Sequence, residues 1–93
     1  MGSLLVTPQV NAIVVDPRDP KIVFAAGPAG VFRSNDSGLS WQSSSEGFET
    51  AAIVALALNP GQPDTLFAAT AEGAFFRSDD GAQTWQSVKE SVP

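Results

Sequence analysis

The chain contains two similar nine-residue segments. RSNDSGLSW occupies residues 33–41 and RSDDGAQTW occupies residues 77–85, which is 44 positions later. The similarity extends outward, so that residues 10–43 align with residues 53–87 after one inserted residue near Ala74 or Phe75. A duplicated segment of this length is one supersecondary unit that packs against its copy. The repeat therefore predicts a single domain, 1–93, built from two equivalent units at about 10–46 and about 53–90.

Each unit contains four short strand signals separated by turn residues. We expect strands at 12–15, 21–26, 31–34 and 39–43 in the first unit, and at 54–58, 65–69, 74–78 and 83–87 in the second. Clusters of Gly, Pro, Asn and Asp stand between them, and no helical periodicity is present. The fold class is therefore predicted to be all-β, with two four-stranded antiparallel units.

The second strand of each unit is apolar at successive positions, as IVFAA at 22–26 and LFAA at 66–69. Side chains of a strand point alternately to its two faces, so such a strand is expected to be buried on both. Four-stranded units of about 40–45 residues that stack face to face around an axis form a β-propeller. An open solenoid or an eight-stranded sandwich is the alternative fold.

The repeated segment carries the chemistry of a tight hairpin turn. An Asp accepts hydrogen bonds from nearby backbone N–H groups, Gly supplies a positive φ, hydroxyls satisfy further groups, and Trp packs beneath the turn. The residues assigned to this structural role are Ser34, Asp36, Gly38, Ser40, Trp41, Ser78, Asp80, Gly81, Thr84 and Trp85. Since Ala82 stands where the first unit has Gly38, we expect the second turn to be distorted.

The segment from Ser34 to Trp41 fits the pattern Ser, any, Asp, any, Gly, any, Ser/Thr, aromatic, and it resembles the Asp-box. Both units resemble blades of the Asp-box (BNR-repeat) propellers, which include sialidases, sortilin-type receptor domains, photosystem II assembly factors and some glycoside hydrolases. The resemblance covers nearly the whole chain and implies that each Asp-box joins the third strand of a blade to the fourth. Arg33 and Arg77, beside the two motifs, are each expected to pair with a nearby acid.

Composition argues against several classes of function. The net charge is −5 with five Lys and Arg and no basic cluster, which disfavours nucleic acid as a partner. No apolar run approaches the ~20 residues that span a membrane. The chain has no Cys, His or Tyr, so a sialidase-like nucleophile is missing and general acid–base chemistry would depend on carboxylates alone. We predict no catalytic residues, no metal site and no cofactor. The composition does not indicate a cellular compartment.

One end of the predicted sheets is the candidate ligand face. If strands alternate in direction, the loops at 27–30, 43–50 and 70–73 share that end, opposite the Pro-containing turns and the repeated turns. The groups with binding potential there are Glu46, Phe48, Glu49 and Glu72. The alternative is that these are ordinary solvated loops. A lectin with sugars bound between blades would need an exposed aromatic side chain, and Phe48 is the candidate.

Two propeller blades would leave two apolar outer faces in water, and such patches mark interaction surfaces. Head-to-tail assembly into a ring would cover both faces. We expect a homo-oligomer of three copies and six blades, as in known two-blade lectins, with four or five copies and eight or ten blades as alternatives. The predicted function is a non-catalytic structural or binding scaffold that binds itself, with a glycan or protein as a further partner. A fragment of a larger propeller or an engineered assembly would share these features; a lectin is the alternative function, and a glycosidase is the third.

Overall fold

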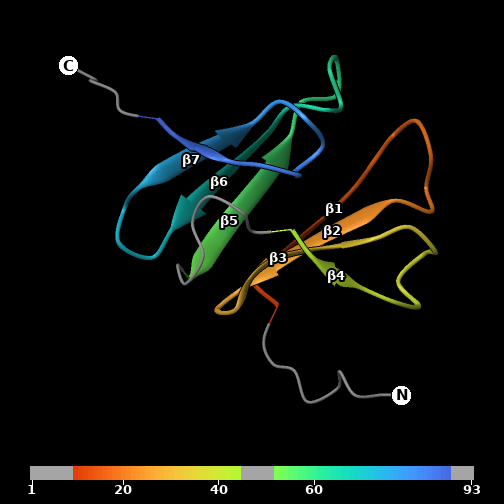
Figure 1. Cartoon of the computed structure of the whole chain (residues 1–93), viewed down its shortest axis with the longest axis horizontal. Helices are drawn as coiled ribbons and strands as arrows, with labels where there is room; N and C mark the ends of the chain where they lie inside the picture. Colours follow the sequence, from red (N-terminus) through yellow and green to blue (C-terminus); the bar gives the residue numbers. More distant parts are fainter. Residues whose placement is uncertain (1–9, 45–51, 89–93) are drawn as a thin grey trace.

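The computed structural model describes residues 10–44 and 52–88, which form two four-stranded antiparallel sheets (Figure 1). The first sheet contains β1 (Ala12–Val15), β2 (Val23–Gly27), β3 (Gly30–Ser34) and β4 (Gln42–Ser43). The second contains β5 (Ile53–Leu58), β6 (Leu66–Thr70), β7 (Phe75–Ser78) and β8 (Gln86–Ser87). Strands follow one another in chain order within each sheet. The predicted all-β class and the four strands per unit are confirmed.

The central strands of the two sheets pair in the same register, and β5 has a register shift between Ile53 and Ala55. Ala25 of β2 lies opposite Phe32 of β3, and the repeat-equivalent Ala68 of β6 lies opposite Phe76 of β7. The last strand of each sheet is shorter than predicted, since β4 and β8 each contain only two residues. The turn before each of them continues through the conserved Ser or Thr of the repeat and takes up residues that the sequence pattern assigned to the strand.

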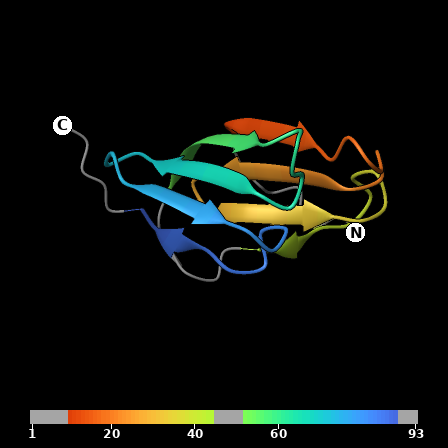
Figure 2. The ribbon, with the colours of Figure 1, turned by 90° about the horizontal axis from the view of Figure 1, so that it is seen from above.

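The sheets lie face to face with their strands in the same order, so that β1 and β5 share one side and β4 and β8 share the other (Figure 2). Strand β5 packs against both β1 and β2. The core forms between the sheets, and its buried residues are Phe24, Ala26, Val31, Ile53, Leu66, Ala68, Ala82 and Trp85. Because the units stack through these faces, each sheet has an inner face toward its neighbour and an outer face directed away from it.

The second strand of each unit is predicted to be buried on both faces by neighbouring units; in the single chain this is observed for Ala25 and Ala26 of β2, whereas one face of β6 is exposed. In β2, Ala25 and Ala26 are both buried although they point to opposite faces. In β6, Leu66 and Ala68 are buried, whereas Phe67 is exposed. The small side chain of Ala25 is 7% exposed on the outer face of its sheet, whereas the large ring of Phe67 is 42% exposed on the outer face of the other.

The turns sort onto two ends of the sheets as predicted. In the first sheet the N–H of Ser37 donates to the carbonyl of Lys21 at 3.0 Å, and in the second the N–H of Gly81 donates to that of Asp64 at 2.9 Å. The Pro-containing turn and the repeated turn therefore meet at one end of each sheet. Glu72 lies in the β6–β7 turn, at the opposite end.

Candidate interaction faces of the two sheets

The first repeated turn, residues 34–41, is held by a closed set of hydrogen bonds around Asp36. The Ser34 hydroxyl donates to Asp36 Oδ1 at 2.8 Å and accepts the N–H groups of Asp36 and Gly38. The N–H of Ser40 donates to Asp36 Oδ1 at 2.8 Å and its hydroxyl donates to Oδ2 at 2.6 Å. Both oxygens of this carboxylate are thus used within the turn that connects β3 to β4.

The second repeated turn, residues 78–85, has the same hydrogen bonds. Thr84 donates to Asp80 through its N–H at 2.9 Å and through its hydroxyl at 2.6 Å, and Ser78 accepts the N–H of Ala82 at 2.9 Å. The expectation of a distorted turn is therefore wrong. Each turn contains two successive left-handed residues, and Ala82 adopts φ 73° at its second position without losing the bond to Ser78.

The turn carboxylates are stabilised in their ionised form. The hydroxyl and N–H of Ser40, followed by the Ser34 hydroxyl, lower the pKa of Asp36 to about 2. For Asp80, burial raises the pKa, but the hydrogen bonds from Thr84 and Ser78 outweigh it and the pKa is lowered. Both acids are held as anions by donors of their own turns, which does not suit a general acid, because a general acid needs a raised pKa.

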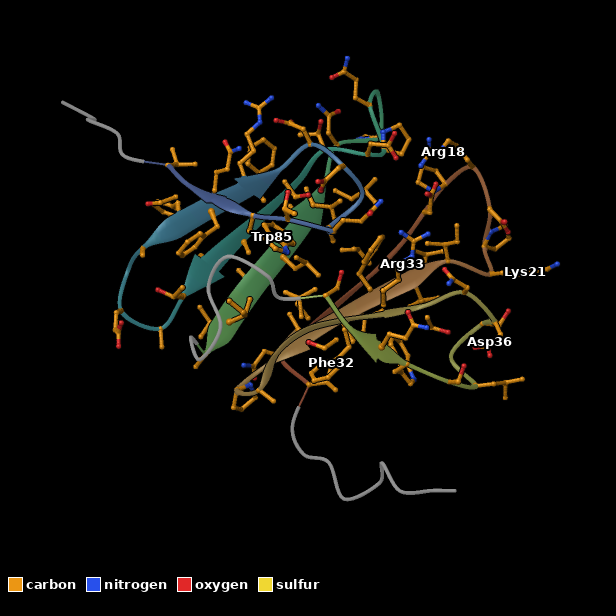
Figure 3. The ribbon with its side chains drawn as sticks, viewed as in Figure 1. Arg18, Lys21, Phe32, Arg33, Asp36 and Trp85 are labelled. Carbon is orange, nitrogen blue, oxygen red and sulfur yellow. The ribbon has the colours of Figure 1, made fainter. Side chains whose placement is uncertain are left out.

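The two tryptophans of the repeat differ in their surroundings. Trp85 is buried in the core, and its indole N–H donates across the gap between the sheets to the carbonyl of Ser44 at 2.8 Å (Figure 3). Trp41 is half-buried, and its indole N–H donates to Gly38 of its own turn at 3.0 Å. The core role predicted for both rings is therefore observed in full only for Trp85, whose turn has a sheet beside it.

Arg33 is a bridge between the sheets. It points toward the second sheet, while its neighbour Phe32 points to the opposite side of the first (Figure 3). Its guanidinium lies 5.6 Å from the centre of the Phe24 ring and donates to the carbonyl of Gly81 at 3.3 Å. Its Nε donates to Asn35 Oδ1 at 2.9 Å, and no acid within residues 10–44 and 52–88 forms an ion pair with it, in contrast to the predicted acid pairing.

Arg77 repeats only the part of this arrangement that lies within one sheet. Its guanidinium stands 5.6 Å from the centre of the Phe67 ring, as Arg33 does above Phe24. It forms an ion pair with Asp79 at 2.9 Å, so the predicted acid pairing is confirmed here. Arg77 lies on the outer face of the second sheet, on the side away from the first.

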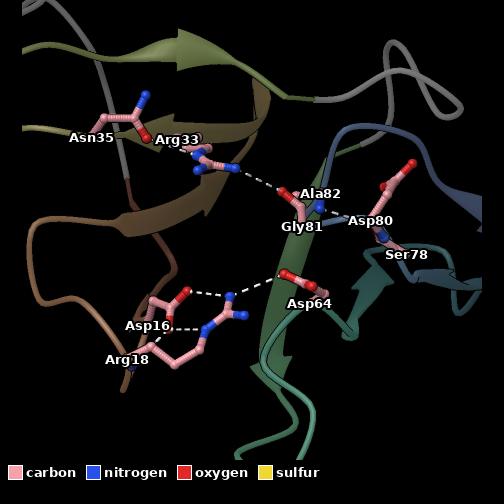
Figure 4. A network of polar contacts seen from close by, with 9 residues as sticks. All are labelled: Asp16, Arg18, Arg33, Asn35, Asp64, Ser78, Asp80, Gly81 and Ala82. Atoms are coloured by element: carbon pink, nitrogen blue, oxygen red, sulfur yellow. Dashed lines mark hydrogen bonds and ion pairs between the residues drawn. The ribbon is translucent and has the colours of Figure 1, made fainter.

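Arg18 forms a second polar bridge, close to that of Arg33 (Figure 4). It pairs with the buried Asp16 of its own turn at 2.8 Å and with Asp64 of the second sheet at 3.0 Å. The hydrogen bond from Arg18 is the main cause that lowers the pKa of Asp16. The bonds to Asp16 and then Asp64 raise the pKa of the Arg18 guanidinium. The charges tie the two Pro-containing turns together.

Two further hydrogen bonds cross between the sheets. The Asn11 side-chain amide donates to the carbonyl of Ile53 at 2.8 Å, and the Ser44 hydroxyl donates to that of Ala82 at 2.5 Å. Sequence reasoning missed these contacts and the Arg18 bridge. A signal existed, because the repeat-equivalents of Arg18 and Asp64 are Gly61 and Lys21. Positions where a repeat departs from itself are candidates for contacts that only one copy makes.

The outer face of the second sheet is the counterpart of the inner face of the first. Phe24 is 1% exposed and its equivalent Phe67 is 42% exposed; Val31 is 0% exposed and its equivalent Phe75 is 59% exposed. Ala55 and Ala57 on β5, also exposed, correspond to Ala12 and Val14. The side chains of this outer face therefore correspond in position to those that the first sheet buries against the second sheet within the chain.

The outer face of the first sheet is likewise the counterpart of the inner face of the second. Val10 is 55% exposed, whereas its equivalent Ile53 is 0% exposed. Ile13 and Val15 are exposed, whereas their equivalents Leu56 and Leu58 pack against the core. The remaining members of this face are Val23, Ala25 and Phe32. We call these two surfaces the β6 outer face and the β2 outer face.

The predicted ligand face is only partly covered by the described residues. Glu72 is exposed in the β6–β7 turn, and Glu46, Phe48 and Glu49 lie outside the described residues. No group of three or more side chains that could hold a metal ion occurs within residues 10–44 and 52–88. In the same ranges, no helix is long and apolar enough to cross a membrane.

Comparison with known proteins identifies the fold. No protein-family model and no curated protein matches the chain. Among solved structures, an ancestral GH74 enzyme is similar over 89% of the chain, with a TM-score of 0.77 and 22% identity, and YCF48 from Cyanidioschyzon merolae over 88%, with a TM-score of 0.69 and 19% identity. The chain spans 13% and 24% of the length of these proteins. Both are β-propeller proteins, so the chain has a propeller-type fold, with two sheets that match propeller blades.

Proposed function

We propose that the chain is a non-catalytic two-blade propeller module of the Asp-box type, which closes into a ring by binding copies of itself. The observation that carries the proposal is the correspondence between its surfaces. Each outer face contains equivalents of the residues that are buried between the two sheets, yet most of its large apolar side chains are exposed in the single chain. Exposed faces of this kind mark interaction surfaces.

The proposed role is that of a structural or binding scaffold. Asp36 and Asp80 are occupied by hydrogen bonds of their own turns, and Asp16, Asp64 and Asp79 form ion pairs with arginines. Carboxylates in such settings support turns and contacts between sheets. A hydrolytic site would need two carboxylates placed across a cleft, one with a raised pKa.

Three copies, which would give six blades, is the preferred assembly, with four or five copies as alternatives. Closure leaves no outer face in water, whereas a chain of fewer copies would expose two. Native mass spectrometry over a dilution series tests the proposal. We expect a stable species of three times the 9.7 kDa mass of one chain. A single-chain mass at micromolar concentration would overturn the self-assembly.

A further inference from the structure

We infer that copies associate head to tail, with the β6 outer face of one copy against the β2 outer face of the next, in the geometry that joins the two sheets within the chain. The inference rests on the proposed self-assembly and specifies its contact. The occupant of each outer face is a second copy of this chain. Arg77 of one copy would then donate to the carbonyl of Ser37 in the next, as Arg33 donates to Gly81.

The apolar part of this contact has a complete template. Within the chain, Phe24 and Val31 of the first sheet pack with Ile53 and Leu66 of the second. Their equivalents are Phe67 and Phe75 on the β6 outer face, and Val10 and Val23 on the β2 outer face. All four equivalents are apolar and larger than Ala. The projecting aromatic side chains of the β6 outer face and the aliphatic side chains that would pack against them on the β2 outer face are therefore both present. Apolar area of this kind is the main driving force for association.

The polar part has a template as well. Arg77 is already held over Phe67 at the 5.6 Å that Arg33 keeps over Phe24, so its guanidinium needs no rearrangement. The receiving turn also has the required shape, because Ser37 is left-handed with φ 66° and its equivalent Gly81 has φ 73°. A preorganised donor and a preorganised carbonyl lower the entropy cost of forming the bond.

Head-to-tail pairing is favoured over pairing of identical faces. A two-fold contact between two β6 outer faces has no template within the chain, because it would place Arg77 and Phe67 against another β6 outer face and not against a β2 outer face. A contact between two β2 outer faces would place Val10 and Ile13 against their own copies. Within the chain, the equivalents of these residues pack only against the face that carries Phe24. The contact within the chain is therefore a template for pairing of unlike faces only.

Cross-linking tests the direction of the contact, because the chain contains no cysteine. Lys21 and Gly61 are the equivalents of Asp64 and Arg18, whose side chains meet at 3.0 Å between the sheets. A Lys21→Cys, Gly61→Cys double variant treated with a short bismaleimide should yield covalent multimers that end at the ring size. Each single variant should yield uncross-linked chains, because identical positions of neighbouring copies stay apart in a head-to-tail ring. An Arg18→Cys, Asp64→Cys variant is the positive control and should link within one chain.

A second variant keeps the test decisive. Phe75→Glu changes a side chain that is exposed in the single chain, and it places a charge inside the inferred contact. In the double-cysteine background it should reduce the covalent multimers at least about tenfold, while circular dichroism shows the fold retained. Cross-linked pairs from either single-cysteine variant, or multimers undiminished by Phe75→Glu, would overturn the head-to-tail contact. Double-cysteine chains that form a ring by mass yet do not cross-link would also overturn it, and would leave the proposed function standing.

Discussion

Phe24 and Phe67 occupy the same position of the repeat, and each has an arginine guanidinium 5.6 Å from the centre of its ring. Phe24 is 1% exposed and Phe67 is 42% exposed. The local structure of the two sheets is therefore the same, and the difference lies in what stands beside them. The difference between the two rings shows how strongly burial of a side chain in this repeat depends on a neighbouring sheet.

The two tryptophans should affect different equilibria. Trp85→Ala removes a buried ring from the contact between the sheets, and we expect it to lower the free energy of unfolding by about 3–5 kcal/mol. Trp41→Ala should cost at most about half as much, because that ring is half-buried in the single chain. Denaturant unfolding in a Phe75→Glu background, in which assembly is blocked, measures both values. Equal losses for the two variants would contradict the assignment.

Trp41 should matter more than Trp85 for assembly, which is the reverse of the order expected for the free energy of unfolding. Because its turn is the equivalent of the turn that carries Trp85, Trp41 is expected to lie at the contact between copies. Trp41→Ala should therefore shift the concentration at which the ring dissociates upward by at least about tenfold. Analytical ultracentrifugation of Trp41→Ala beside wild type checks this, and an unchanged dissociation midpoint would place Trp41 outside the contact.

Acid should destabilise the fold through the turn carboxylates. The folded-state pKa of Asp36, about 2, lies below its ordinary value of 3.8. The ionised carboxylate therefore contributes stability that is fully present above pH 4 and is lost as the pH falls toward 2. Thermal unfolding between pH 7 and pH 2 should show a falling Tm over this interval.

Asp36→Asn is the matched variant for that experiment. It keeps an oxygen that can accept from the Ser40 N–H, but it removes the negative charge and replaces Oδ2, which accepts from the Ser40 hydroxyl, with an NH2 group. We expect a lower Tm than wild type at pH 7 and a smaller difference at pH 2, where the wild-type carboxylate is itself becoming protonated. A difference that stays constant over the whole pH range would show that the charge of Asp36 does not stabilise the turn.

The Arg18 bridge can be transferred to the contact between copies. The variant Lys21→Asp, Asn59→Asp, Gly61→Arg copies Asp64, Asp16 and Arg18 onto their equivalents. A Cβ on Gly61 would meet only Asn59 Oδ1, at 3.5 Å, so the position accepts a side chain. We expect tighter assembly, by up to about 1 kcal/mol per contact at low salt and less at high salt. The variant with Gly61 retained is the control and should assemble no better than wild type.

Gly38 should tolerate alanine better than its φ of 93° suggests. Ala82 already occupies the equivalent position at φ 73° and keeps its bond to Ser78. An added Cβ at Gly38 would meet Trp41 Cζ2 at 3.6 Å, which is ordinary contact. Gly38→Ala should therefore cost about 1 kcal/mol, the expense of a left-handed residue with a side chain. A loss of several kcal/mol in chemical denaturation would show that the two turns are not interchangeable.

Much of the fold follows from the sequence because its determinants are local. The alternation of short apolar runs with Gly and Pro predicts the strands, and the eight residues from Ser34 to Trp41 contain the donors that bind both oxygens of Asp36. The Ala82 error has the same local origin, because Ala was judged by its propensity for positive φ. The bond to Ser78 and the burial of Ala82 at the contact between the sheets outweigh that propensity.

By itself the sequence determined the two equivalent units, their strands and the turns that join them, since those structures depend on groups a few residues apart. Only the tertiary structure decided which of two identical side chains is covered. Arg33 reaches Gly81 and Phe24 is buried because a second sheet lies beside them, while Arg77 and Phe67 have the same local geometry on an outer face. The repeat makes the two units alike, and the stacking of one on the other makes their surfaces unlike, because burial depends on neighbours distant in the chain.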